Sequence, residues 1–187
     1  MKTSIRDMAL AALFASLTAA GAYIKIPLPY IPLTMQCFFC LFSGILLGSK
    51  LGLISQVIYV LTGLVGIPIF TNGGGPQYIF QPTFGYIIGF AVGAYVTGKV
   101  FETLKKVSIK NILVSSLSGL ACIYLLGLPY MYLIYNLYLD KAKSFQWVFY
   151  WGFLTCIGGD LLSSIILALT ARRIIPVLKS AGLIKHI

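Results

Sequence analysis

The sequence predicts an all-α integral membrane protein, a bundle of six transmembrane helices with both termini in the cytoplasm. Two features of the composition lead to this prediction: 59% of the 187 residues are hydrophobic and only 10% are charged. Soluble domains carry about 25% charged residues, so this chain cannot cover a water-exposed surface with polar groups. A third feature is that apolar runs of helical length alternate with short polar links. We expect a single membrane domain over residues 1–187.

Six apolar segments are candidates for membrane-spanning helices, because about 20 apolar helical residues cross a bilayer. The second and third are short and meet at the turn around Lys50, which predicts a tight helical hairpin. The first resembles a signal peptide, with Lys2 and Arg6 ahead of an apolar run, but no soluble domain follows, so we interpret it as a spanning helix. The six segments are residues 7–26, 34–49, 51–67, 83–101, 111–135 and 147–171.

The basic residues predict the orientation, since cytoplasmic loops of membrane proteins are enriched in lysine and arginine. With six spans, one side carries only Lys25, Lys141 and Lys143. The other side, which we predict to be cytoplasmic, carries the remaining eleven: Lys2, Arg6, Lys50, Lys99, Lys105, Lys106, Lys110, Arg172, Arg173, Lys179 and Lys185. The net charge of +10 is therefore spread over the links and forms no basic face, which argues against a nucleic-acid partner. We expect the partner of the surface to be the lipid bilayer of a bacterial plasma membrane.

One long uncharged segment, Gly63 to Tyr86, interrupts the apolar chain and falls on the external side. It contains three consecutive glycines and three of the eight prolines. Loops at a membrane surface tend to be short and charged, so this one favours a segment that lies against the protein and lines a site. The alternative is a loose surface loop. Because the proline-rich link Ile26 to Thr34 lies on the same side, we expect a site for an imported solute on the external face.

Asp160 is the strongest candidate for a ligand-binding residue, because it lies near the middle of the sixth apolar segment, after Gly158 and Gly159. A carboxylate there costs several kcal/mol unless it is paired or lines a wet cavity. The alternative is a protonated aspartic acid capped by a neighbouring hydroxyl group. We expect Asp160 to accept N–H bonds from a small ligand.

Two amides and several aromatic residues would complete such a site. Gln36, which follows Thr34 at the outer face, offers hydrogen-bond donors and an acceptor, as does Asn72. Asn72 also suits a simple turn. Lys25 is the nearest positive charge for a ligand carboxylate, although a lysine at a helix end often only extends to the interface. The aromatic residues, which would wall a pocket or form the belt at the membrane interface, are Tyr78, Phe80, Phe84, Tyr86 and Trp151.

The sequence shows no catalytic set, and we expect no enzyme activity, no metal site and no cofactor. The single histidine is His186, the four cysteines lie in apolar runs, and three of the four acidic residues lie at helix ends or in loops. The run from Gly44 to Lys50 lacks the spacing and the preceding strand of a phosphate-binding loop. The alternatives to a binding subunit are a free-standing secondary transporter, which often has an internal repeat that is not visible here, and a scaffold protein without a ligand.

Small residues spaced four apart form flat rows that let another helix come close. The fourth segment carries Gly85, Gly89 and Gly93. The first carries Ala11, Ala15 and Ala19, with Ala12, Ser16 and Ala20 one step round. One row could pack within the bundle, and we expect the row Ala11, Ala15 and Ala19 to contact a different subunit.

Several motifs, in order along nearly the whole chain, resemble the BioY family, the biotin-specific S components of energy-coupling-factor (ECF) transporters. The matching runs are PLPYIPLTMQ, SGILLGSKLGLISQVIYVLTGLVGIPIF, TNGGG, QPTFGY and GGDLL. The resemblance implies a six-helix protein that binds biotin at an external pocket. It also implies partners, namely a transmembrane coupling subunit and two ATPase subunits of the ATP-binding-cassette (ABC) type.

The resemblance also implies which residues contact biotin. The positions that match family motifs, or stand beside them, are Thr34, Gln36, Asn72, Tyr86, Asp160 and Ser163. Ser163 stands where the family usually has a lysine, in a G-D-x-x-K pattern, and Gln81 and Phe84 replace glycines of a second motif. An S component for a different vitamin therefore remains an alternative to one for biotin.

Overall fold

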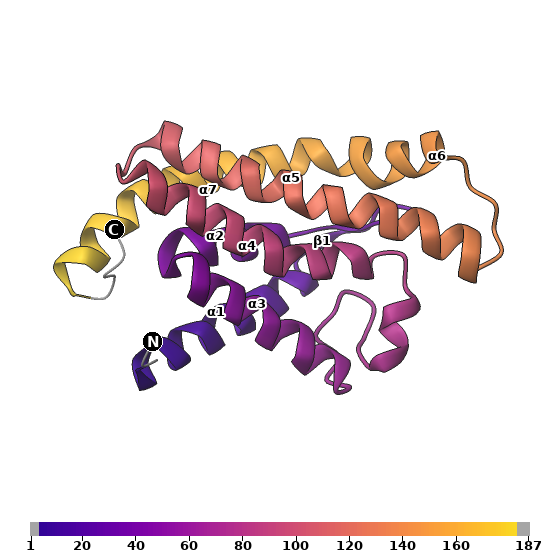
Figure 1. Cartoon of the computed structure of the whole chain (residues 1–187), viewed down its shortest axis with the longest axis horizontal. Helices are drawn as coiled ribbons and strands as arrows, with labels where there is room; N and C mark the ends of the chain where they lie inside the picture. The colour runs from indigo at the N-terminus through magenta and orange to yellow at the C-terminus, as the bar shows by residue number, and fades with distance from the viewer. Residues whose placement is uncertain (1–3, 183–187) are drawn as a thin grey trace.

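The computed structural model describes residues 4–182, and most of them lie in helices. The helices α4, α5 and α7 run side by side along the long axis of the molecule, and α1 and α3 form the opposite side (Figure 1). The main helices are α1 (Ile5–Tyr23), α2 (Gln36–Leu47), α3 (Ser49–Leu64), α4 (Phe84–Leu104), α5 (Ile109–Leu133) and α7 (Thr155–Ser180). The shorter elements are β1 (Lys25–Ile26), β2 (Leu33–Thr34), the 3-10 helix η1 (Pro76–Phe80), the π-helices η2 (Ile134–Tyr138) and η3 (Tyr150–Leu154), and α6 (Phe145–Phe149).

Each of the six predicted segments overlaps a helical stretch, and the chain is a multi-pass membrane protein. The bounds differ most in the sixth, predicted at 147–171 and helical over Phe145–Ser180. Four helical stretches are long and apolar enough to cross a bilayer: Ile5–Tyr23, Phe84–Leu104, Ile109–Tyr138 and Phe145–Ser180. The helices α2 and α3 are apolar but shorter, as the hairpin prediction required. Gly48, with φ of +83°, separates them.

Helix ends follow from local capping. Ser4 and Asp7 form a reciprocal capping box at the start of α1. The carboxylate of Glu102, from α4, accepts hydrogen bonds from the backbone N–H of Ser49 at 2.7 Å and from its hydroxyl group. This side chain therefore fixes the turn of the α2–α3 hairpin against α4 by satisfying a free N–H at the start of α3.

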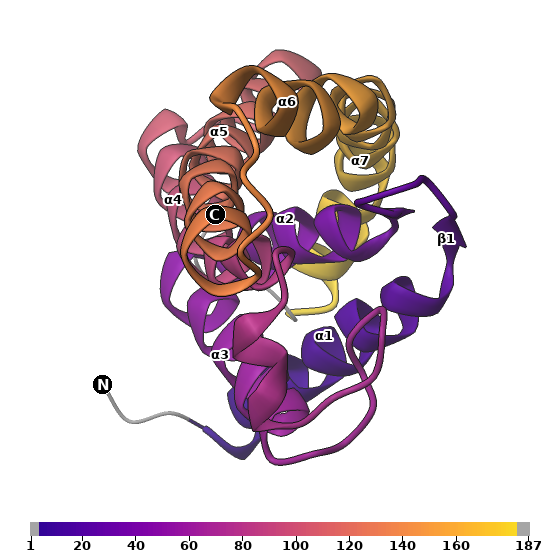
Figure 2. The ribbon, with the colours of Figure 1, turned by 90° about the vertical axis from the view of Figure 1, so that its right-hand side faces the viewer.

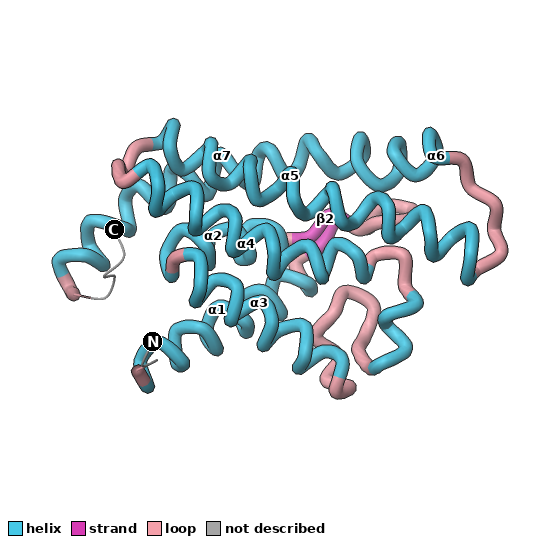
Figure 3. The backbone as a smooth tube through the Cα atoms, viewed as in Figure 1, coloured by secondary structure: helices cyan, strands magenta, loops and turns pink. Residues whose placement is uncertain are grey.

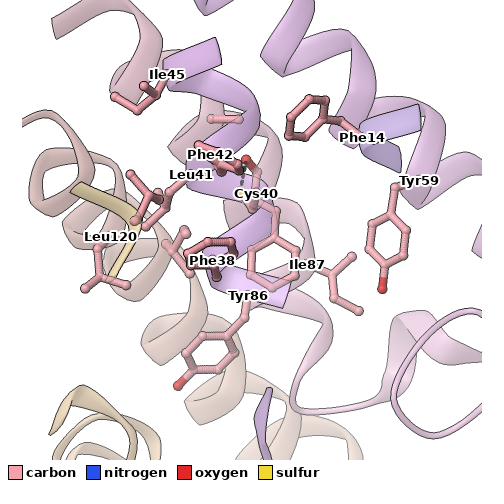
Figure 4. Packing of buried hydrophobic residues seen from close by; sticks show 14 of the residues in the cluster. Phe14, Phe38, Cys40, Leu41, Phe42, Ile45, Tyr59, Tyr86, Ile87 and Leu120 are labelled. Atoms are coloured by element: carbon pink, nitrogen blue, oxygen red, sulfur yellow. Dashed lines mark hydrogen bonds between the residues drawn. The ribbon is translucent and has the colours of Figure 1, made fainter. Parts of the chain in front are cut away.

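The helix α2 lies at the centre of the bundle, with neighbours α1, α3, α4, α5 and α7. Ten of its 12 residues are buried. Aromatic and aliphatic side chains from α1, α2, α4 and α5 interlock around it (Figure 4), and the rings of Phe14 and Phe42 lie 5.9 Å apart. Because α2 begins at Gln36, the position of this helix in the core also buries that amide.

The two ends of the bundle differ in the segments they carry. The start of α1 and the end of α7 meet at one end, where the Arg6 guanidinium donates to the carbonyl group of Gly182 at 2.9 Å. The β1–β2 link, the segment between α3 and α4, and the segment between α5 and α6 extend toward the other end (Figure 3). In the end-on view these segments lie around the space between the helices (Figure 2).

The glycine row of α4 packs against α5. This agrees with the expectation that one row of small residues packs within the bundle. A Cβ atom at Gly89 would lie 2.9 Å from the backbone of Ile123, and one at Gly85 would overlap Tyr130. On α5, Gly119 is as close to α4: a Cβ atom there would lie 2.5 Å from the carbonyl oxygen of Gly93. The two helices therefore touch through their backbones.

The row Ala11, Ala15 and Ala19 of α1 was predicted to contact another subunit, but the structure buries it inside the bundle. Ala11 is 0% exposed and Ala15 is 6% exposed, while Ala19 is half-buried. This row faces the bundle, where α1 packs against α2 and α3. The row one residue further on is the exposed one: Ala12, Ser16 and Ala20.

The close contact of α4 and α5 yields a prediction for stability. We expect Gly119→Ala to destabilise the protein by about 1–3 kcal/mol, because the added methyl group has no room between the helices. Gly158→Ala is the matched control, since a Cβ atom on Gly158 has no neighbour within 4 Å. In a helix interior this change should stabilise by about 0.5–1 kcal/mol. Thermal unfolding of both variants in detergent tests this, and equal melting temperatures would contradict it.

Candidate ligand-binding site

A cavity opens between the central helix α2 and the segments at the end of the bundle opposite to the termini. Its space, together with the solvent at its open mouth, amounts to about 600 Å³. Its walls come from α2, α4, α5, α7, the β1–β2 link and the segment between α3 and α4. The lining residues are Ile31, Pro32, Leu33, Thr34, Gln36, Cys37, Thr71, Asn72, Tyr78, Thr83, Tyr86, Ile87, Phe90, Ile123, Tyr124, Gly152, Cys156 and Asp160.

Asp160 is the one charged side chain that lines the cavity, and it is only 5% exposed. Its carboxylate accepts a hydrogen bond from the hydroxyl group of Tyr124 on α5. The thiol group of Cys37, at the start of α2, faces the same carboxylate. No lysine or arginine is among the lining residues. The carboxylate is thus held by neutral donors, which leaves lone pairs available for N–H groups of a ligand.

A second hydrogen bond closes the wall beside Asp160. The hydroxyl group of Tyr86, on α4, donates to the carbonyl oxygen of Gly152 at 3.0 Å. Gly152 belongs to the π-helix η3, a rare form of helix that is frequent at functional sites. A Cβ atom at Gly152 would lie 2.7 Å from the Tyr86 oxygen, so only glycine allows this contact without displacement.

Gln36 joins three parts of the outer wall. Its Oε1 accepts hydrogen bonds from the hydroxyl groups of Thr34, at 3.1 Å, and Thr71, at 2.9 Å. Its Nε2 donates to the hydroxyl group of Tyr59, which in turn donates to the carbonyl oxygen of Ile69. This amide therefore ties the β1–β2 link and the glycine-rich segment to the core, and one of its two N–H groups is left for another acceptor.

The glycine-rich segment is folded against the protein, which excludes the alternative of a loose loop. Gly75 donates its N–H to the carbonyl oxygen of Gly63 at 2.8 Å. The positive φ angles in this segment belong to three glycines, Gly66, Gly73 and Gly75, at +118°, +114° and +104°. Asn72 lies in the turn between Phe70 and Gly73, which exchange two backbone hydrogen bonds, so its role in a turn is observed, and it also lines the cavity.

The cavity brings together five of the six predicted substrate-binding residues: Thr34, Gln36, Asn72, Tyr86 and Asp160. The sixth, Ser163, is half-buried one turn after Asp160 and lies outside the lining. Among the aromatic candidates, Tyr78 and Tyr86 line the cavity. The others lie elsewhere: Phe80 stacks on Tyr138, Phe84 is buried in the core, and Trp151 packs on Tyr30.

Sequence reasoning missed Tyr124, Thr71 and the two cysteines that line the cavity, Cys37 and Cys156. Tyr124 lies in an apolar stretch of α5 with no local pattern that marks it. Cys37 follows Gln36 directly, so its place in the site could have been inferred from that neighbour. Gly159, predicted to make room for a ligand or a backbone, makes room for the side chain of Leu33, since a Cβ atom there would lie 2.2 Å from it.

Comparisons with known proteins agree with the motifs. The model of the BioY family matches residues 1–180. A probable biotin transporter BioY from Lysinibacillus sphaericus is 43% identical over 182 residues, covering 97% of this chain and 93% of the relative. The biotin transporter BioY of Thermotoga maritima is 37% identical, covering 91% and 96%.

A solved structure shares the fold. The crystal structure of the S component for biotin from an ECF-type ABC transporter superposes with a TM-score of 0.78 over 91% of this chain and 90% of that one, at 21% identity. At that identity the superposition establishes the arrangement of the helices and not the ligand. The family match over nearly the whole chain, together with relatives of this similarity, shows that the protein belongs to the BioY family.

Proposed function

We propose that this protein is the biotin-binding S component of an ECF-type vitamin uptake transporter. Membership of the BioY family supports this proposal, and the curated relatives are named biotin transporters. The structural observation that carries it is the Asp160 carboxylate, held by Tyr124 inside an otherwise uncharged cavity. The role is binding and transport, with no chemical step.

The ligand's chemistry matches the two ends of the cavity. The ureido ring of biotin presents two N–H donors and one carbonyl acceptor. Asp160 would accept the N–H bonds, and these charge-assisted bonds are stronger than neutral ones. The apolar ring system would lie against Tyr86, Phe90 and Ile123. The spare N–H of Gln36 and the amide of Asn72 are available for neutral acceptors.

The membrane topology in this proposal has six crossings and both termini in the cytoplasm. The bond between Arg6 and Gly182 supports a common side for the two ends, because it brings the start of α1 to the end of α7. The segments that close the cavity extend toward the opposite end, which would face the outside of a bacterial plasma membrane (Figure 3). The whole chain, residues 1–187, acts as one substrate-binding domain.

Transport requires partners in this account, namely a transmembrane coupling subunit and two ABC-type ATPases. The described residues contain no nucleotide-binding motif, so the energy for uptake would come from the ATPases. We place the contact with the coupling subunit on the exposed face of α1, because Ala12, Ser16 and Ala20 form a flat row there. Such rows let a second helix pack closely within a bilayer.

The first prediction concerns the buried carboxylate. We expect Asp160→Asn to weaken biotin binding about 10- to 100-fold, because a hydrogen bond to a charged group contributes about 1.5–3 kcal/mol. Tyr124→Phe should weaken it less, since the carboxylate remains but loses the donor that holds it. Calorimetric titration of the purified protein in detergent measures both.

Asp140→Asn is the matched control, because Asp140 lies in the segment between α5 and α6, outside the cavity. It removes the same charge and should leave the affinity unchanged. Other vitamins serve as competitors in the same titration. Undiminished biotin binding by Asp160→Asn, or displacement of biotin by an unrelated vitamin, would contradict the proposal.

The second prediction concerns docking. Ser16→Trp should abolish biotin uptake in cells that carry the energy-coupling module, and it should leave biotin binding by the purified protein unchanged. The reason is that Ser16 is on the exposed face of α1, away from the cavity. Leu169→Trp places the same bulk on an exposed position of α7, where Leu169 is 50% exposed, and should retain uptake. Normal uptake by Ser16→Trp would exclude this face as the contact.

A further inference from the structure

Lys25 is a basic residue at the rim of the cavity, and the β1–β2 ribbon fixes its direction. It pairs with Thr34 across the antiparallel ribbon. Residues directly opposite each other in such a pair have their side chains on the same face, with Cβ atoms about 4.5–5.5 Å apart. Because Thr34 lines the cavity and bonds to Gln36, the side chain of Lys25 leaves the ribbon on the cavity side.

The ammonium group of Lys25 is held by a second lining residue. Its Nζ donates to the carbonyl oxygen of Thr71 at 3.0 Å, while the hydroxyl group of Thr71 donates to Gln36. A lysine that merely extends to the membrane interface would point its ammonium group into water. This one lies between Thr34 and Thr71, and two of its three N–H donors remain for another acceptor.

The electrostatics of the cavity determine where an anionic group of the ligand can lie. The lining contains one carboxylate, Asp160, and no basic side chain. A ligand carboxylate inside the cavity would face Asp160 without a counter-charge, which is costly in a medium of low dielectric constant. With the N–H groups of the ligand at Asp160, its carboxylate is therefore directed to the rim, where Lys25 is located.

From this geometry we propose that Lys25 determines specificity for the charged form of the ligand, by binding its carboxylate at the rim. The inference rests on the proposed function, since it takes biotin as the ligand with its ureido ring at Asp160. Lys143, another lysine on the same side of the predicted topology, lies 4.7 Å from the ring centre of Trp147. Because Trp147 does not line the cavity, Lys143 has the same charge without the same placement.

The test compares biotin with its uncharged methyl ester in calorimetric titrations of the full chain at low salt. We expect Lys25→Gln to weaken biotin binding about fivefold, near the upper end for an exposed ion pair, and to leave binding of the ester unchanged. Lys25→Arg should restore most of the loss. Lys143→Gln is the matched control and should alter neither affinity. Added salt should weaken binding of biotin to the wild type and have little effect on Lys25→Gln.

The outcomes separate this inference from the proposed function. Equal weakening of biotin and of the ester by Lys25→Gln would overturn the inference, because Lys25 would then act only by holding Thr71. An unchanged affinity for biotin in Lys25→Gln, or an equal loss in Lys143→Gln, would also overturn it while biotin binding by the wild type stands. Failure of the wild type to bind either ligand would instead overturn the proposed function, and this inference with it.

Discussion

A carboxylate inside an apolar bundle has to be supplied with hydrogen-bond donors, and the pair formed by Asp160 and Tyr124 meets that requirement here. It joins α7 to α5 across the cavity, so the register of these two helices and the position of the carboxylate depend on each other. Because the lining has no basic side chain, the Asp160 carboxylate forms no ion pair with another residue of the cavity wall. In our account the N–H groups of the ligand bind to the acceptor sites of this carboxylate that remain free.

The outer wall depends on an analogous arrangement around Gln36. One amide at the start of the central helix holds Thr34 of the β1–β2 link and Thr71 of the glycine-rich segment. Both segments are thereby attached to the start of α2, a helix that is buried on nearly all sides. Lys25 adds a contact from the outer end of α1 to the same segment.

Sequence reasoning predicted the segments of the fold and several polar residues that line the candidate site, because charges and polar groups are rare in an apolar chain and each one is informative. It could not predict Tyr124, whose partner Asp160 is 36 residues away, since that contact depends on the register between two helices. It also chose the wrong face of α1. In a bilayer the outer surface is as apolar as the core, so the sequence pattern does not distinguish Ala11 and Ala15, which face inward, from Ala12 and Ser16.

The central claim is the orientation of the ligand between a buried carboxylate and a basic rim. A crystal structure of this protein with biotin bound tests it most directly. The account predicts a ureido nitrogen within hydrogen-bonding distance of the Asp160 carboxylate, next to Tyr124, and the biotin carboxylate beside Lys25. Biotin bound in the reverse direction, or outside this cavity, would contradict it.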